Sequence, residues 1–142
     1  MILLDSSLIV AYLNKVDVNH AKALRIVEDV ERGRYGGSVI TDYIFDETIT
    51  VMLFKMKDVG RVAELGGKLL SANLMVRIDE DSFDLAWRIF REQERPAFSF
   101  TDCSSIAACR VNGISNIATF DRAFNIVSGK SHTIYGWDES ER

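Results

Sequence analysis

Short apolar runs recur along the chain and are separated by longer segments of mixed character. The first run, residues 2–5, contains Ile2, Leu3 and Leu4 and ends at Asp5. Runs of this length that are bounded by polar or turn residues are typical of buried strands. By this criterion strands are expected at 2–5, 38–41, 74–78 and 117–119, with a last short strand at 132–135.

The segments between these runs carry the three- to four-residue apolar spacing of helices. In one segment, four apolar residues share this spacing before Gly33, a stop signal: Ala21, Leu24, Val27 and Val30. The first helix is expected to be capped by Ser6 and Ser7. Helices are therefore predicted at about 6–13, 18–32, 42–56, 59–71, 79–94, 101–111 and 120–127.

Strands that alternate with helices predict a mostly parallel sheet with helices on both faces. The expected fold class is therefore α/β. No repeat, low-complexity segment or linker interrupts residues 1–142, so we expect a single domain, and 142 residues can bury a sizeable core. The acidic residues Asp138, Glu139 and Glu141 are expected to lie in a solvated, flexible tail.

Composition and charge exclude several classes of protein. Hydrophobic residues make up 47% of the chain, yet no stretch approaches the roughly 20 apolar residues of a membrane helix. Residues 1–5 lack the basic start of a signal peptide, and the helical spacing of Cys103 and Cys109 disfavours a disulfide. We therefore expect a soluble, cytoplasmic protein without a membrane segment. The net charge of −4 argues against a protein that coats nucleic acid, although bound divalent metal would offset part of it.

Three acidic residues stand where strands end or a helix begins. Asp5 and Asp121 follow expected strands, and sites in open parallel sheets form outside the carboxyl ends of the strands. Asp102 begins an apolar helix, where the helix dipole favours an anion. If these carboxylates meet, their repulsion requires a counter-charge, which a divalent metal ion commonly supplies.

Glu47 is a fourth candidate because of its place on a helix. It lies on a predicted inward-facing stripe together with Ile44, Val51 and Phe54. The neighbouring Asp46 lies on a more polar side and is expected to be solvated. An inward Glu can also pair with an arginine, so the stripe alone leaves both interpretations open.

Each of the other acids also has a purely structural interpretation. Asp5 can accept hydrogen bonds from the turn that follows it, and Asp102 can form a capping box with Ser99. Asp121 can serve as an ordinary acid at a helix N-terminus. For Asp79, which also follows a strand, we favour the capping role because residues 79–82 form one cluster of capping residues.

The segments that carry the four acids resemble those of the PIN-domain family, which includes the VapC-type toxins of bacterial and archaeal toxin–antitoxin pairs. The resembling segments are DSS at 5–7, TDYIFDET at 41–48, SFTD at 99–102 and TFDRAF at 119–124. They occur in the family's order and cover nearly the whole chain. A further Asp that many family members carry immediately before the closing Phe is Ala123 here, so Asp121 is the only fourth acid.

The resemblance implies a three-layer α/β/α sandwich and a Mg²⁺- or Mn²⁺-dependent endoribonuclease, the toxin of a toxin–antitoxin pair. Carried over by position, the catalytic acids are Asp5, Glu47, Asp102 and Asp121. Ser6 and Thr119 become supporting hydroxyls. We expect Asp5 and Asp102 to bind the metal, with Glu47 and Asp121 acting directly or through water. The resemblance also implies an RNA substrate, a homodimer and a cognate antitoxin protein.

Two alternatives differ from this hypothesis in class. A small-substrate phosphohydrolase of the aspartyl type needs a second Asp two residues after the first, and this chain has Ser7 there. A PIN-like scaffold that binds RNA or protein without catalysis is the second alternative. Metal-dependent RNA cleavage that is lost in Asp102→Asn would separate the enzyme from the scaffold.

Overall fold

Five parallel strands form one sheet in a computed structural model, which describes residues 1–127 and 133–136. The strand order is β3-β2-β1-β4-β5, so β1 is central and β3 and β5 are the edges. Leu3 of β1 lies opposite Val39 of β2 on one side and Ile117 of β4 on the other. The strands are β1 (Ile2–Leu4), β2 (Ser38–Thr41), β3 (Leu74–Val76), β4 (Asn116–Ala118) and β5 (Thr133–Tyr135).

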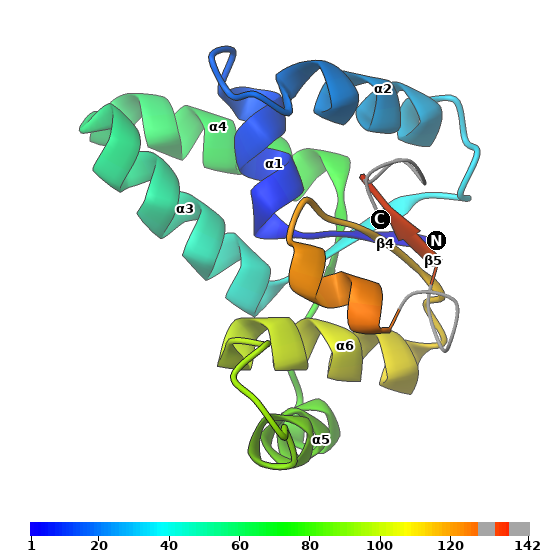
Figure 1. Ribbon diagram of the computed structural model, residues 1–142. Coiled ribbons are helices and arrows are strands. Elements are labelled where there is room, and N and C mark those ends of the chain that lie inside the picture. The colour runs from blue at the N-terminus through cyan, green and yellow to red at the C-terminus, as the bar shows by residue number, and fades with distance from the viewer. Residues whose placement is uncertain (128–132, 137–142) are drawn as a thin grey trace.

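Helices cover both faces of this sheet. The chain contains α1 (Ser6–Leu13), α2 (His20–Glu31), α3 (Asp42–Met56), α4 (Val59–Ala72), α5 (Glu80–Arg91), α6 (Phe100–Asn112) and the 3₁₀ helix η1 (Arg122–Ile126). Figure 1 shows α1, α2 and α4 on one side of the sheet and α6 on the other, with α5 packed outside α6. The predicted α/β fold and its α/β/α layering are therefore confirmed. None of the described helices is both long and apolar enough to cross a membrane.

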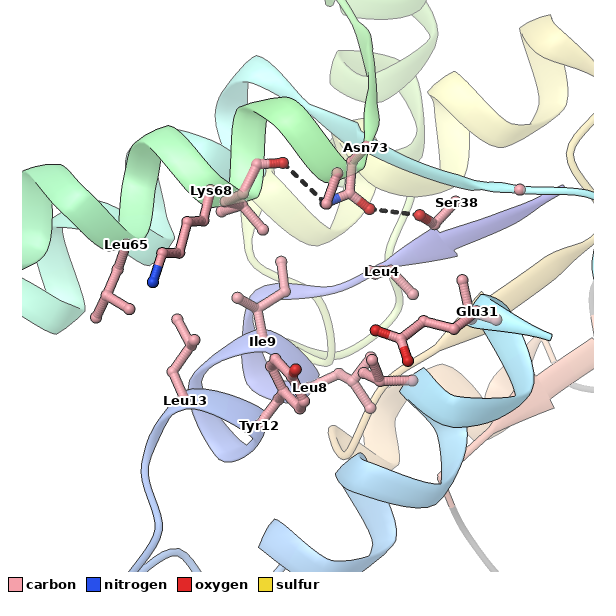
Figure 2. Close-up of a pocket in the computed structure, with 15 residues that line it drawn as sticks. Leu4, Leu8, Ile9, Tyr12, Leu13, Glu31, Ser38, Leu65, Lys68 and Asn73 are labelled. Atoms are coloured by element: carbon pink, nitrogen blue, oxygen red, sulfur yellow. Dashed lines mark hydrogen bonds between the residues drawn. The ribbon is translucent and has the colours of Figure 1, made fainter. Parts of the chain in front are cut away.

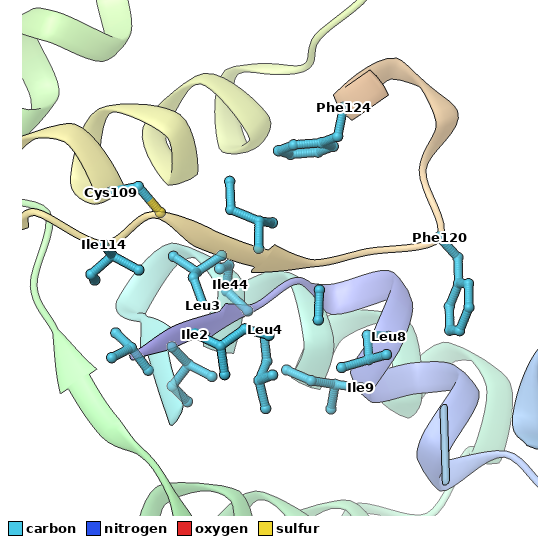
Figure 3. Packing of buried hydrophobic residues seen from close by; sticks show 14 of the residues in the cluster. Ile2, Leu3, Leu4, Leu8, Ile9, Ile44, Cys109, Ile114, Phe120 and Phe124 are labelled. Atoms are coloured by element: carbon cyan, nitrogen blue, oxygen red, sulfur yellow. The ribbon is translucent and has the colours of Figure 1, made fainter. Parts of the chain in front are cut away.

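The core lies on both faces of the central strands. All three residues of β1 are buried, as expected for a strand that is covered on both sides. Figure 3 shows Cys109 and Phe124 on one side of the strands and Leu8 and Ile9 of α1 on the other. Apolar burial thus fixes β1 and β4 side by side, which brings their carboxyl ends together.

Several expected element ends are wrong by a few residues, and local hydrogen bonds explain two of them. β3 ends at Val76 instead of residue 78 because the amide of Ile78 donates to Oδ1 of Asp42, at 2.9 Å. The segment 120–127 forms a 3₁₀ helix at Arg122–Ile126, since Asp121 caps it through the amide of Ala123. The predicted start of the last strand at residue 132 and the acidic tail lie outside the described residues.

Two predicted helical faces are also wrong in part. The buried residue of α2 is Ala23, whereas Leu24 is exposed. On α3 the buried residues are Ile44, Thr48 and Met52, and Phe54 is 80% exposed. Figure 1 shows that the C-terminal half of α3 extends beyond the sheet beside α4, so its last turns have no sheet to cover.

Candidate active site

The four predicted acids gather at the carboxyl edge of β1 and β4. Asp5 directly follows β1, and Asp121 lies just after β4. Asp102 comes from the first turn of α6 and Glu47 from the second turn of α3. The charges of Asp5 and Asp121 both raise the pKa of Glu47 and of Asp102, which requires the carboxylates to be near one another.

Asp5 is the most deeply buried of the four, with 2% of its surface exposed. Burial raises its pKa, and the charge of Asp121 adds to the rise. The hydroxyls of Thr119 and Ser7 oppose it, because each donates a hydrogen bond of 2.8 Å to Oδ2. The other oxygen, Oδ1, is buried without a hydrogen-bond partner. A buried unpaired oxygen costs free energy, so this atom is a candidate for binding a cation.

Asp102 combines the structural role with a place in the acid cluster. It forms a capping box with Ser99: Oδ2 accepts from the Ser99 amide at 3.0 Å, and the Asp102 amide donates to the Ser99 hydroxyl at 3.1 Å. Burial, with a smaller contribution from the charge of Asp5, raises the pKa of Asp102 to about 6. The cap stabilises the charged form of this carboxyl, so the raised pKa shows that burial outweighs the cap, with the charges of Asp5 and Asp121 as smaller contributions.

Glu47 was predicted to lie on the inward-facing stripe of α3, and it is half-buried beside the buried Ile44 and Thr48. Burial raises its pKa first, the charge of Asp5 raises it further, and a hydrogen bond with the Ser6 side chain opposes both. Its Oε2 is buried and has no hydrogen-bond partner. Glu47 makes no salt bridge with any described Lys or Arg, so the alternative of an inward Glu–Arg pair is not observed.

Asp121 is the acid most strongly engaged in local structure. Its side chain accepts from the amide of Ala123 at 2.9 Å and caps η1, as the structural interpretation predicted. Its own amide donates to Oγ1 of Thr119 at 3.0 Å. The cap orients this carboxylate, while its charge still acts on Asp5 and Asp102.

The hydroxyls around the acids differ from those predicted in one respect. Thr119 is fully buried and bonds Asp5, and Ser6 bonds Glu47, so both lie where they were expected. Ser7 was expected only to cap α1, but the N-cap of that helix is Asp5, which makes no side-chain cap bond. The hydroxyl of Ser7 instead contacts Asp5 and Thr119. The available signal was its spacing, since a hydroxyl two residues after an acid at a helix start can turn back to it.

The donor chemistry at this edge suits a hard divalent ion. Asp5 and Glu47 each present a buried oxygen without a partner, and no described Lys or Arg forms a salt bridge with any of the four acids. Carboxylate oxygens are the ligands that Mg²⁺ and Mn²⁺ prefer. In the part of the chain that the structure describes, no three His, Cys, Asp or Glu side chains stand in ready metal-binding geometry. Binding would therefore require acids other than Asp5, whose Oδ2 is held by two hydroxyls, to rotate toward the ion.

A separate apolar cavity of about 500 Å³ lies on the other side of α1, between α1, α2 and α4. Figure 2 shows Leu8, Leu13 and Leu65 lining it, with Glu31 and Lys68 as its charged residues. None of the four acids lines this cavity. It is therefore distinct from the candidate active site.

Comparisons with known proteins agree with this architecture. The model of the PIN domain family matches residues 2–130. A VapC ribonuclease of Archaeoglobus fulgidus is 25% identical over 142 residues, which cover 99% of this chain and 89% of that protein. The crystal structure of Mycobacterium tuberculosis VapC20, described as a sarcin–ricin loop cleaving toxin, superposes with a TM-score of 0.77 at 23% identity. That superposition covers 90% of this chain and 95% of the other, and it supports the fold.

Proposed function

Because the chain belongs to the PIN domain family, we propose that it is a metal-dependent endoribonuclease and the toxin of a toxin–antitoxin pair. The names of its relatives, a VapC ribonuclease and a toxin that cleaves the sarcin–ricin loop, support this assignment. The extent of the match supports a single domain over residues 1–142.

One observation carries the proposal more than any other: buried acids lie together, and no salt bridge joins them to a basic side chain among residues 1–127 and 133–136. The pKa values of Asp5, Glu47 and Asp102 are all raised, with burial as the largest cause in each case. A fold that keeps such a cluster sacrifices stability unless a cation binds there. Structural acids elsewhere in this chain, such as Glu64 beside Arg61 and Lys68, have basic neighbours instead.

In the proposed mechanism Asp5 and Asp102 hold the ion, and Glu47 and Asp121 act directly or through water. When bound there, Mg²⁺ or Mn²⁺ would supply Lewis acidity, which would make water more acidic and offset negative charge on the phosphate. Oε2 of Glu47 lacks a hydrogen-bond partner, and its raised pKa makes it a suitable acceptor for the proton of an attacking water. The Asp121 carboxylate is held in place because it caps η1, and it contributes its negative charge to the site.

The aspartyl phosphohydrolase alternative fits these contacts less well. That chemistry needs a carboxyl two residues after the nucleophilic Asp to protonate the leaving group. Here the side chain at that position is the Ser7 hydroxyl, which donates to Asp5 itself. We therefore retain the nuclease as the single proposed activity.

The direct experiment measures cleavage of a fluorescent single-stranded RNA by the purified chain with EDTA, Mg²⁺ or Mn²⁺. We expect cleavage only with metal, and its loss in Asp102→Asn, because that change removes a ligand charge while an amide oxygen can still accept the Ser99 hydrogen bond. Isothermal titration with Mn²⁺ should show the matching loss of binding. Cleavage that persists in Asp102→Asn would point to a contaminating nuclease and refute the assignment.

We also propose a homodimer, a cognate antitoxin and a cytoplasmic location. The exposed aromatic residues Phe83, Trp87 and Phe90 on α5 support a protein interface, because exposed apolar patches commonly mark such surfaces. Free, buried Cys103 and Cys109 agree with a reducing compartment. Light scattering of the isolated chain and co-purification with the product of an adjacent small gene test the first two.

A further inference from the structure

The hydroxyl of Ser7 lies at the centre of a hydrogen-bond network that the proposed mechanism has not used. It lies 2.8 Å from Oδ2 of Asp5 and 3.1 Å from Oγ1 of Thr119, and it accepts from the amide of Phe120 at 3.0 Å. Thr119 Oγ1 in turn donates to the same Oδ2 and accepts from the amide of Asp121. Two hydroxyls therefore converge on one carboxylate oxygen from positions 112 residues apart in the sequence.

The available protons determine the direction of these bonds. Each hydroxyl has one proton to donate, and each already accepts from a backbone amide, Ser7 from Phe120 and Thr119 from Asp121. Their protons therefore point toward the carboxylate, where charge makes the bond stronger. With Oδ2 held twice, rotation of the Asp5 carboxyl is restricted, and Oδ1 is left as its only free oxygen.

The same network fixes the backbone that carries Asp121. The amides of Phe120 and Asp121 are the two donors that the hydroxyls accept, so the β4–η1 connection is tied to the start of α1. Gly136 also packs closely against this connection, since a Cβ there would clash with the carbonyl oxygen of Thr119.

We propose that Ser7 is a positioning residue for metal binding: with Thr119 it holds Oδ2 of Asp5 so that Oδ1 faces the ion. This inference rests on the proposed metal site but not on the identity of the RNA substrate. Ser7 touches neither the ion nor the substrate, and acts only through Asp5 and the connection that carries Asp121. Partners that orient metal ligands typically contribute about 10–100-fold in metal affinity or activity.

The test compares variants that lose a hydroxyl of the network with control variants that keep it. Ser7→Ala and Thr119→Val each delete a network hydroxyl. As controls, Thr119→Ser deletes only a methyl group, and Ser71→Ala removes an exposed hydroxyl that bonds within α4. Mn²⁺ affinity is measured by calorimetry, and folding is checked by thermal melting in EDTA. RNA cleavage is then measured over a range of Mn²⁺ concentrations.

We expect Ser7→Ala and Thr119→Val to weaken Mn²⁺ binding by about 10–100-fold, while Thr119→Ser and Ser71→Ala stay close to the parent chain. Cleavage by Ser7→Ala should recover substantially at high Mn²⁺, since the ligands themselves remain. The double variant should lose less affinity than the product of the two single losses, because both hydroxyls hold one oxygen.

Three outcomes would overturn the inference. One is a folded Ser7→Ala chain that binds Mn²⁺ as tightly as the parent, and another is equal loss in Thr119→Ser and Thr119→Val. The third is a parent chain that binds no Mn²⁺, which also removes the proposed nuclease. A parent chain that binds Mn²⁺ but cuts no RNA refutes only the nuclease, and the affinities of the variants still decide the role of Ser7.

Discussion

Two places in this molecule have the same local order of strand, acid and helix, yet their acids behave in opposite ways. After β3, Asp79 caps α5 by accepting from the amide of Ser82, and this hydrogen bond lowers its pKa. After β1, Asp5 makes no cap bond to α1, and burial raises its pKa. Asp79 is exposed, whereas Asp5 is buried.

The position of each strand in the sheet accounts for the difference. β3 is an edge strand, so the acid that follows it stays in water. β1 is central, and the chain after its neighbour β4 folds over its carboxyl end, bringing Thr119 and Asp121 to Asp5. An acid at a strand end therefore becomes a candidate for chemistry only when the sheet topology surrounds it with other segments.

The largest expected contrast is in catalysis. Asp5→Asn removes a ligand charge from the central site and should reduce RNA cleavage by at least about 100-fold, as the loss of one preorganised electrostatic group typically does. Asp79→Asn, the same chemical change at the edge, should leave the cleavage rate unchanged. Single-turnover cleavage rates at saturating Mn²⁺ measure both. Equal losses in the two variants would show that sheet position is irrelevant.

The second contrast is in stabilisation by metal. A ligand that binds only the folded chain, present at 100 times its dissociation constant, adds about 2.7 kcal/mol to the free energy of unfolding. Mn²⁺ should therefore raise the melting temperature of the parent chain and of Asp79→Asn equally. Asp5→Asn should show little or no rise. Calcium and magnesium series in the same assay report on the selectivity of the site.

The third contrast is in pH dependence without metal. An acid with a raised pKa binds more protons in the folded chain than in the unfolded chain. The free energy of unfolding therefore falls as the pH rises above the ordinary carboxyl pKa of about 4. For Asp102 this interval extends to about 6. The lowered pKa of Asp79 acts with the opposite sign, so its stabilisation is present above about pH 4 and is lost as pH falls.

Urea unfolding in EDTA between about pH 2 and 7 measures these slopes. Asp102→Asn should lose less stability than the parent chain as pH rises toward 6 and beyond. Asp79→Asn should lose less stability than the parent on acidification. If all three chains have the same pH slope, the proposed electrostatic difference between the two regions is wrong.

The smallest contrast is a simple loss of a cap. Asp79→Ala removes the acceptor for the Ser82 amide and should lower the melting temperature modestly, because helix caps contribute to stability. Mn²⁺ affinity should stay the same, since the Asp79 side chain is exposed and bonds the start of α5, away from the four acids. Melting curves with and without Mn²⁺ provide the measurement, and a change in affinity would connect the two regions.

Local signals in the sequence predicted the fold, whereas the choice of the four acids also needed the resemblance of their segments to PIN domains. Buried strands appear in the sequence as apolar runs, and an acid immediately after such a run, such as Asp5, is easily identified. Ser7 was missed as a partner of Asp5 because its other partners, Thr119 and Phe120, lie more than a hundred positions away and only pairing of β1 with β4 brings them near. Phe54 was misplaced because helical spacing cannot tell where a helix leaves the sheet it covers.

The sheet order has a consequence for how the chain is made. During translation Asp5, Glu47 and Asp102 leave the ribosome before β4, so β1 then has a neighbour on one side only. Thr119 and Asp121 emerge later. The Thr119 hydroxyl donates a hydrogen bond to Asp5, and the charge of Asp121 raises the pKa of Asp5. The carboxyl edge that holds Asp5 is therefore complete only after residue 121 has emerged and β4 has paired with β1.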